Sequence, residues 1–291
     1  MLSFAPHLYR DVLTARGGPI AKVDAAKVEK TNHPAFLANA YLRADLASPS
    51  NHVIYSNTDG SGSADNRAVA QHMAISEALE RWACRQTLNS GDARKYFFHL
   101  DPSSNGMAAF PGFKWQARRR ARFEALERWA MIGWWDGSLK GQVSQAPYPD
   151  VGMVRIEHDQ PGEVVVLFHK SSGGHVAYGH AAGRTLISAA AKAAIELGRS
   201  EYVLAKYRAR GAMAKITNFY EERCLHFSTP EGHSQFLRKA YAVPSKPTPA
   251  WRVLFDGEVA GPWSKYATVW RQVVQMPTYA FFDRQESFFL W

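Results

Sequence analysis

The chain has 291 residues, of which 46% are hydrophobic and 13% aromatic, as in a folded protein with a sizeable core. No apolar run approaches the roughly 20 residues that span a bilayer, and no signal peptide is apparent, so a cytoplasmic protein without a membrane partner is expected. Two cysteines without CxxC spacing argue against a disulfide framework or a zinc site, and the net charge of +9 comes without a standard nucleic-acid-binding motif.

The first half of the chain predicts two long helices. Residues 51–64 are polar and rich in glycine and serine, and they are expected to form a loop. Asp65 is placed to cap a helix from about residue 68 to residue 86. An aromatic strand is expected at 96–100, and a second helix runs from about residue 115 to residue 135.

The second half predicts a mixture of strands and capped helices. The expected elements are a hairpin of residues 151–157 and 163–169, a helix from Thr185 to Gly211, a helix opening at Thr229-Pro230, and strands at 251–255 and 268–274. Helices alternate with strands, so the predicted class is α+β. No linker-like segment divides the chain, which predicts a single domain over residues 1–291.

The heptapeptide Glu-Ala-Leu-Glu-Arg-Trp-Ala occurs twice, at 77–83 and at 124–130. On a helix, each copy places two carboxylates and an arginine on one face. One interpretation is two amphipathic helices with solvated Glu/Arg faces. Because the whole heptapeptide is duplicated, we favour a second interpretation, in which the two copies (the Glu/Arg words) form a ligand site. The carboxylates would bind divalent cations, and the arginines would bind the phosphate groups between those cations. Trp82 and Trp129 would pack behind the carboxylates.

Three blocks of this sequence resemble the signature segments of the YcaO family. They are Gly62-Ser63-Ala64 with Glu77-Ala78-Leu79-Glu80-Arg81, Ser104-Asn105-Gly106-Met107-Ala108-Ala109 with Glu124-Ala125-Leu126-Glu127-Arg128, and Gly179-His180-Ala181-Ala182-Gly183 with Ala193-Ala194-Ile195-Glu196. A weaker block lies at 229–233, and together the blocks cover about residues 50–240. The resemblance implies a YcaO-type fold, with mixed sheets and central helices that carry the paired motifs.

The resemblance also implies an ATP- and Mg²⁺-dependent enzyme that activates a peptide backbone amide toward a nucleophile. The product would be an azoline, a thioamide or an amidine, depending on the nucleophile. Carried over position by position, the expected metal ligands are Glu77, Glu80, Glu124 and Glu127. Arg81 and Arg128 would contact phosphate, although one of them could instead orient a carboxylate. Asn105 and Glu196 are candidates for nucleotide or metal contacts. Arg199 is not carried over from the family pattern, but it could replace some of the positive charge that the family usually has at the nucleotide. Mg²⁺ prefers oxygen ligands and usually retains some water, which agrees with these roles.

The chain departs from the family pattern at several points. Ser63 stands where a lysine is usual, Met73 where a serine is usual, and Arg199 where a glutamine is frequent. The two Glu/Arg words are also closer together than usual, and the proline-rich tail of azoline-forming members is absent. These departures favour an alternative, a catalytically degenerate scaffold or substrate-binding subunit of a peptide-modifying complex.

The expected partners are a precursor peptide or protein and a leader-binding accessory protein, with a homodimer as a further possibility through an exposed Trp291. His169, His175 and His180 lie close together in the sequence, but their spacing is not a standard ligand pattern, so satisfied or exposed histidines are expected. Cys84 and Cys224 have no recognisable catalytic context and are expected to be buried.

Overall fold

The computed structural model describes residues 3–27, 36–47, 51–55, 57–211, 216–283 and 288–289, so Trp291 lies outside the described residues. The chain folds into two compact units, each with an apolar core of its own. Unit 1 comprises Met1–Ser50, Thr58–Ala125 and Val253–Val274, and unit 2 comprises Asn51–Asn57, Leu126–Arg252 and Gln275–Trp291. The single domain expected over residues 1–291 stays a prediction.

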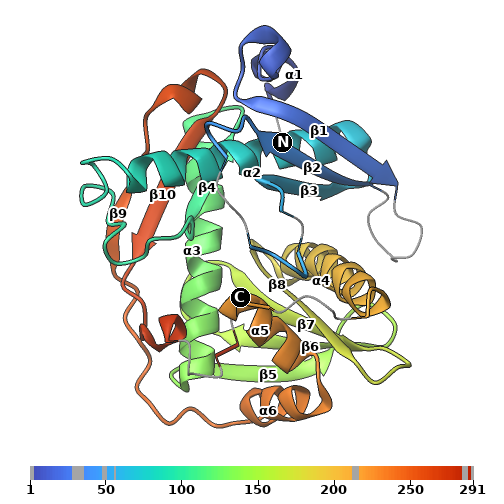
Figure 1. The fold of residues 1–291 in the computed structure, drawn as a ribbon. Helices are drawn as coiled ribbons and strands as arrows, with labels where there is room; N and C mark the ends of the chain where they lie inside the picture. The colour runs from blue at the N-terminus through green and yellow to red at the C-terminus, as the bar shows by residue number, and fades with distance from the viewer. Residues whose placement is uncertain are drawn as a thin grey trace. The chain divides into compact units, whose positions relative to one another are not determined.

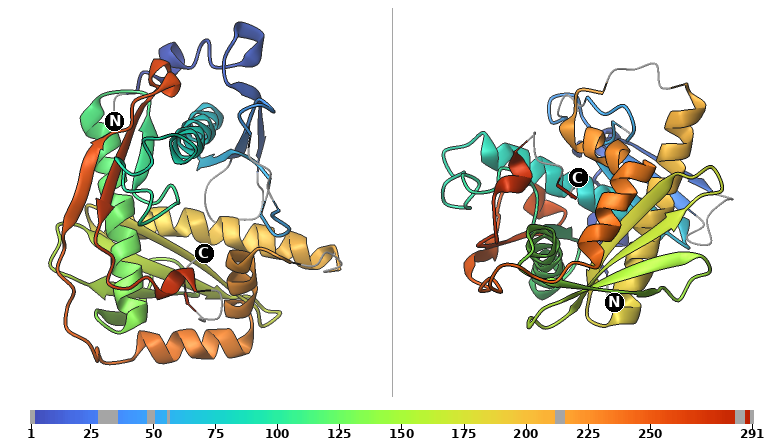
Figure 2. Two further views of the ribbon diagram at one scale, coloured as in Figure 1. Left: turned by 60° about the vertical axis from the view of Figure 1, so that its left-hand side comes forward. Right: turned by 90° about the horizontal axis from the view of Figure 1, so that it is seen from below.

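The first sheet of unit 1 is antiparallel and has the order β1-β2-β3. Its strands are β1 (Ile20–Lys27), β2 (Phe36–Leu42) and β3 (Gly60–Ala64), preceded by the short helices α1 (Ala5–Leu8) and η1 (Thr14–Arg16). Helix α2 (Arg67–Leu88) packs against β3 and β2, as Figures 1 and 2 show. The loop predicted for residues 51–64 is therefore wrong at its end, where β3 pairs with β2.

Two glycines of β3 allow its backbone to touch α2 directly. A Cβ atom on Gly60 would lie 2.2 Å from the carbonyl oxygen of Ala74, and one on Gly62 would lie 2.2 Å from that of Ala70. Real Cβ atoms do not approach so closely, so these positions require glycine opposite alanine. The small residues that suggested a loop are the residues that let a strand lie against a helix.

Helix α2 confirms the predicted helix with a shifted cap. The side chain of Asn66, rather than that of Asp65, accepts hydrogen bonds from the backbone N–H groups of Ala68 and Val69. Trp82 is buried, and its ring meets Trp263 edge to face with the centroids 5.6 Å apart. Trp82 thus packs into the core of unit 1 behind the first Glu/Arg word, as expected.

The second sheet of unit 1 has the order β4-β10-β9 and is also antiparallel. Its strands are β4 (Met107–Phe110), β9 (Val253–Glu258) and β10 (Thr268–Val274), with η2 (Pro262–Lys265) between the last two. The strand predicted at 96–100 is wrong, because these residues form turns in which Phe97 has a φ of 59°. Phe98 is nevertheless buried, so the aromatic run serves the core without pairing in a sheet.

Unit 2 contains a four-stranded antiparallel meander. Its strands are β5 (Lys140–Gln145), β6 (Val151–Glu157), β7 (Glu163–Lys170) and β8 (Val176–Gly183), in that order. Helix α4 (Leu186–Ala209) lies along β8 and β7 (Figure 2). The predicted hairpin of β6 and β7 is confirmed, and so is the cap at Thr185, which exchanges hydrogen bonds with Ser188.

Strand β8 meets α4 as β3 meets α2. A Cβ on Gly179 would lie 2.2 Å from the Ala193 carbonyl oxygen, and one on Gly183 would lie 2.5 Å from the backbone nitrogen of Ala189. Ala189, Ala193 and Ala194 of α4 are buried in the core of unit 2. The alanine-rich sequence therefore reflects contact between two backbones.

The remaining helices of unit 2 enclose an aromatic cluster. They are α5 (Phe219–Phe227), α6 (Pro230–Ala240) and η3 (Ala280–Phe282). Trp134, Trp135, Phe227, Phe236 and Phe289 are buried, with ring centroids between 4.9 and 5.9 Å apart in most of their contacts. The helix predicted to open at Thr229-Pro230 is confirmed by the bond from the Gly232 N–H to the Thr229 hydroxyl.

Helix α3 (Lys114–Asp136) confirms the second predicted helix and carries the second Glu/Arg word. Its residues up to Ala125 are assigned to unit 1 and those from Leu126 to unit 2. Trp129 is fully buried in unit 2, 5.4 Å from the ring centroid of Trp251. In the parts of the chain that the structure describes, no helix has the length and apolar character needed to cross a membrane.

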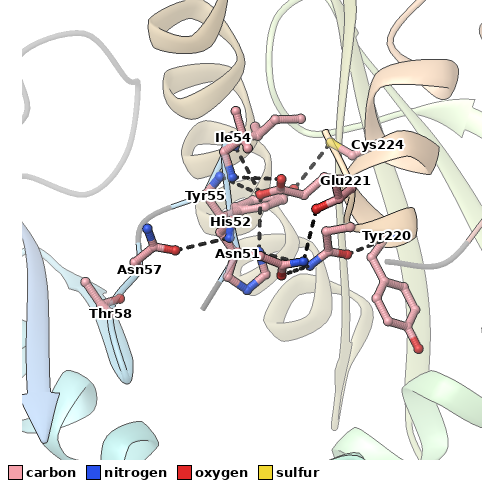
Figure 3. Close-up of polar contacts among 12 residues, drawn as sticks. Asn51, His52, Ile54, Tyr55, Asn57, Thr58, Tyr220, Glu221 and Cys224 are labelled. Carbon is pink, nitrogen blue, oxygen red and sulfur yellow. Dashed lines mark hydrogen bonds and ion pairs between the residues drawn. The ribbon is translucent and has the colours of Figure 1, made fainter. Parts of the chain in front are cut away.

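The segment from Asn51 to Asn57 is held in unit 2 by one buried carboxylate (Figure 3). Glu221 of α5 has no exposed surface, and it accepts hydrogen bonds from the backbone N–H groups of Val53, Ile54 and Tyr55, at 2.9 to 3.1 Å. The His52 Nδ1 atom lies 3.2 Å from the same carboxylate. Ile54 joins the apolar core of unit 2, so this segment is anchored by both polar and apolar contacts.

We expect Glu221→Ala to lower the free energy of unfolding by about 3 kcal/mol, because three backbone N–H groups would lose their acceptor. Amide hydrogen exchange at Val53, Ile54 and Tyr55 should accelerate in the same variant. The control is Glu231→Ala, which removes an exposed carboxylate from the first turn of α6 and should cost less than about 1 kcal/mol. Unchanged exchange at the three amides would contradict the anchoring role of Glu221.

Candidate functional site

The predicted site residues are distributed over both units. Unit 1 contains Glu77, Glu80 and Arg81 on α2, Asn105 in the loop before β4, and Glu124 on α3. Unit 2 contains Glu127 and Arg128 on α3, and Glu196 and Arg199 on α4. Several of these side chains form hydrogen bonds to groups on a neighbouring strand, turn or helix.

Glu77 is bound on both of its oxygens. Oε2 accepts the backbone N–H of Ser61 at the exposed edge of β3, at 2.8 Å, and Oε1 accepts Arg81 Nη2 at 2.6 Å. Arg81 also donates through Nη1 to the carbonyl oxygen of Thr58, at 3.1 Å. Arg81 thus joins Glu77 to the backbone before β3, and its expected contact with phosphate stays a prediction.

Glu80 lies one turn further along α2. Burial of its carboxyl group, and next the charge of Glu77, raise the pKa of Glu80 to about 8. The charge of Arg81 and hydrogen bonds from the Ser104 hydroxyl and the Ala109 backbone oppose this rise without cancelling it. Near neutral pH the pair therefore holds a proton that an isolated glutamate would release.

Asn105 is fixed in a tight polar loop. Its Nδ2 donates to Asp101 Oδ2 at 3.2 Å, and its backbone N–H donates to the Ser103 hydroxyl at 3.1 Å. Gly106, which follows, has a φ of +67° and lies against the backbone of Gln272, where a side chain would not fit. The Asn-Gly pair of the second sequence block is thus a structural turn whose neighbour, Ser104, reaches Glu80.

Glu127 has two partners on β8. His180 Nδ1 lies 2.7 Å from Oε1, and the backbone N–H of Ala182 donates to Oε2 at 3.1 Å. Burial alone would raise the pKa of Glu127, but the hydrogen bond and charge of His180, with help from Arg128 and Ala182, outweigh it and lower that pKa. Glu127 is therefore held as a carboxylate by protein groups.

The other two charged groups differ in exposure. Arg199 Nη1 donates to both oxygens of Glu196, at 2.9 and 3.2 Å, and the Glu196 side chain is 48% exposed. Arg128 is more enclosed, and its Nε atom is buried without a hydrogen-bond partner among the described residues. A buried guanidinium N–H in that condition leaves room for an acceptor from outside the protein, and the Nε atom of Arg271 is in the same condition.

Glu124 lies in unit 1, close enough to Arg271 of β10 for their charges to interact. Among the residues that the structure describes, no three His, Cys, Asp or Glu side chains gather closely enough to hold a metal ion by themselves. Mg²⁺ commonly takes only one or two protein carboxylates and completes its shell with water and phosphate oxygens. The predicted metal roles of Glu77, Glu80, Glu124 and Glu127 stay predictions.

Two of the three histidines pair with glutamates, His175 is exposed, and both cysteines are buried. His169 pairs with Glu201 of α4 at 2.5 Å, and His180 pairs with Glu127 of α3. Neither histidine has an acidic neighbour in the sequence, so both find their partners on distant helices. Cys84 and Cys224 are both buried, and burial raises their pKa values to about 12 and about 11. Neither thiol is activated as a nucleophile.

Sequence reasoning missed three residues that touch the predicted carboxylates. They are Ser61, Ser104 and His180. All three lie inside or beside the blocks that resemble family signatures, between glycines or next to Asn-Gly. The sequence signal for these three residues is that each is a polar residue in a glycine-rich or Asn-Gly segment next to a Glu/Arg helix.

Comparison with solved structures finds similar folds. The chain matches a chain of the E. coli microcin synthetase McbBCD complex with pro-MccB17 bound, with a TM-score of 0.58 and 11% identity, covering 90% of this chain and 88% of that one. It also matches a heterocyclase in complex with substrate and cofactor, with a TM-score of 0.59 and 11% identity over 91% of this chain and 51% of that one. No protein-family model matches, and no curated protein matches by sequence. The α+β class is confirmed, and the fold is heterocyclase-like.

The raised pKa of Glu80 predicts a pH-dependent cost in stability. The folded state keeps its proton up to about pH 8, whereas the unfolded chain releases it at the ordinary glutamate pKa near 4.5. Stability should therefore fall as the pH rises through this interval and then level off. Glu80→Gln keeps the shape and the hydrogen-bond acceptor without the charge, so it should be about 2 kcal/mol more stable than wild type at pH 8.5 and similar to it at pH 5.

The measurement is urea unfolding at both pH values in the presence of a chelator. Glu231→Gln is the control, because this carboxylate is exposed and should show no such pH dependence. An equal effect of Glu80→Gln at pH 5 and pH 8.5 would contradict the assignment.

Proposed function

We propose that this chain is an ATP- and Mg²⁺-dependent enzyme of modified-peptide biosynthesis that activates a backbone amide of a peptide substrate. The observation that carries the proposal is the close pair of carboxyl groups of Glu77 and Glu80, in which Glu80 has a raised pKa, within a heterocyclase-like fold. Two carboxyl groups at close range hold a proton when no cation is present, and a divalent cation is the natural replacement for that proton.

The substrate class is supported by the structural neighbours. One is a microcin synthetase complex with a pro-peptide bound, and the other is a heterocyclase with substrate and cofactor. We therefore propose a precursor peptide as substrate and an accessory protein as partner, since the microcin synthetase is a complex. At 11% identity the likeness is one of fold, so the chemistry must be argued from the site.

Each unit holds side chains suited to one kind of ligand, and each unit is considered by itself. In unit 1, Glu80 and Glu77 would supply oxygen ligands to Mg²⁺, and Arg81 orients Glu77 through its 2.6 Å hydrogen bond. In unit 2, Arg128 has a buried Nε atom without a partner among the described residues, suited to a phosphate oxygen. Bound MgATP would supply the phosphoryl group that turns the amide oxygen into a leaving group.

A second candidate function is a non-catalytic subunit that retains the fold. The observation that favours it is that Glu77, Glu127 and Glu196 already have protein partners, namely Arg81, His180 and Arg199. Carboxylates paired in this way stabilise helices and strands without any ligand. Such a subunit would bind peptide or partner protein but would not consume ATP.

Calorimetric titration with MgATP tests the nucleotide site. Wild type should bind, and Glu77→Gln and Glu124→Gln should each weaken binding by about tenfold or more, because each removes a charged ligand. Glu231→Gln, an exposed change on α6, should bind as wild type does. Absence of binding by wild type, or equal affinity in all four proteins, would refute the nucleotide site.

Release of ADP with the cognate precursor peptide separates the two functions. The enzyme should release ADP in step with loss of water from the peptide, or with entry of its sulfur or nitrogen nucleophile, detected by mass spectrometry. A protein that binds the peptide without releasing ADP would be the non-catalytic subunit.

A further inference from the structure

Arg271 is a charged residue at the centre of an apolar strand. It lies on β10 between Val269 and Val273, and all three side chains are buried. Arg271 has no exposed surface. Its guanidinium group stacks on the ring of Phe98, 3.7 Å from the ring centroid. A buried cation is costly, so its retention here calls for a specific set of partners.

Those partners are two carbonyl oxygens of one loop. Nη1 donates to the carbonyl oxygen of Ser103 and Nη2 to that of Asp101, both at 2.8 Å. The two bonds use the fork of the guanidinium group, whose donors have fixed directions. A lysine ammonium would carry the same charge but would not reproduce this planar pair of bonds.

The loop from Asp101 to Gly106 is also fixed from inside and at its far end. Asp101 Oδ1 accepts the backbone N–H and the hydroxyl of Ser103, at 3.0 and 2.5 Å, and Oδ2 accepts Asn105 Nδ2. The carbonyl oxygen of Gly106 accepts the N–H of Gln272, the residue after Arg271, at 2.8 Å. Two consecutive residues of β10 thus hold both ends of the loop.

This loop supplies Ser104, whose hydroxyl donates to Glu80, and it carries Asn105. We infer that Arg271 is a positioning residue of the nucleotide site, because it sets the loop that places Ser104 on Glu80 and orients Asn105. The effect of Arg271 on nucleotide binding rests on the proposed function. Its effect on the loop rests only on the contacts within unit 1. In this inference Arg271 acts through the loop and not by contact with substrate or nucleotide.

The test uses the full chain and two measurements on Arg271→Lys. Amide exchange should accelerate by about tenfold or more at Ser103 and Asn105, while amides in the middle of α2 keep their protection. MgATP affinity should fall by about tenfold, as for other residues that orient ligands from behind. Arg118→Lys is the matched control, since Arg118 bonds Asp256 with its side chain 59% exposed, and both readouts should stay at wild-type values.

A double-mutant cycle separates positioning from general loss of stability. In a Ser104→Ala background, Arg271→Lys should weaken MgATP binding by less than it does in wild type, because the route through Ser104 is already lost. Independent, additive effects would overturn the inference. If Arg271→Lys fails to fold, Asp101→Asn loosens the same loop from inside and should give the same changes in exchange and affinity.

The outcomes also distinguish the inference from the proposed function. A wild type that does not bind MgATP refutes the function, and the exchange measurement still decides whether Arg271 holds the loop. A wild type that binds MgATP, with unchanged loop exchange or unchanged affinity in Arg271→Lys, refutes the inference alone.

Discussion

Direct contact between the backbone of a glycine strand and an alanine helix is the constraint on which both units depend. Gly60 and Gly62 bring β3 onto α2, and Gly179 brings β8 onto α4, at distances that leave no room for a Cβ atom. Such proximity brings the polar edge of each strand within reach of the helix side chains. Ser61 can therefore donate its backbone N–H to Glu77 over 2.8 Å. A larger residue at these glycines would push the strand away and separate that pair.

The two strand–helix pairs are built to the same pattern. Gly60 meets Ala74 and Ala78, and Gly179 meets Ala193 and Leu197, with the same spacings along the chain. Glu77 and Glu196 then occupy equivalent helix positions. They differ in surroundings, because Glu77 binds a strand N–H as well as Arg81, whereas Glu196 is bonded by Arg199. The same scaffold thus yields one carboxylate tied to its strand and one paired along its own helix.

Electrostatics divides the predicted carboxylates into two kinds. Glu127 is stabilised in its charged form by His180 and by a backbone N–H, so a ligand there would have to compete with groups already in place. Glu80 instead shares excess negative charge with Glu77, which favours a proton or a cation. The proposed function relies on this preference in unit 1 and, independently, on the buried Nε donor of Arg128 in unit 2, which has no partner among the described residues.

Local sequence signals were sufficient for the long elements and insufficient for the strands that depend on distant partners. Caps at Thr185 and Thr229 predicted helix starts because a cap is decided within four residues. Strand β3 could not be predicted, because its glycines acquire a strand role only against α2 and β2. The aromatic run at 96–100 shows the reverse, since β propensity was overridden by a turn.

In the site, the repeated word identified Glu77, Glu80 and Glu127 as residues with special surroundings. It did not identify the partners Ser61, Ser104 and His180, which lie on other elements. Arg271 carried a signal that was overlooked, namely a single charge on the inward side of an otherwise apolar strand. Such a residue must be satisfied inside the protein, and its partners mark a loop that the fold has reason to fix.

The division of the chain into units also bears on how the protein is made. The chain passes from one unit to the other five times, between residues 50 and 51, 57 and 58, 125 and 126, 252 and 253, and 274 and 275. Strands β9 and β10, which complete the second sheet of unit 1, are therefore synthesised long after β4. At a translation rate of ~5–20 residues per second, Arg271 follows Asn105 by on the order of ten seconds or more. During that interval the loop from Asp101 to Gly106 lacks its bonds to β10, so its conformation in the nascent chain is held only by the bonds within the loop.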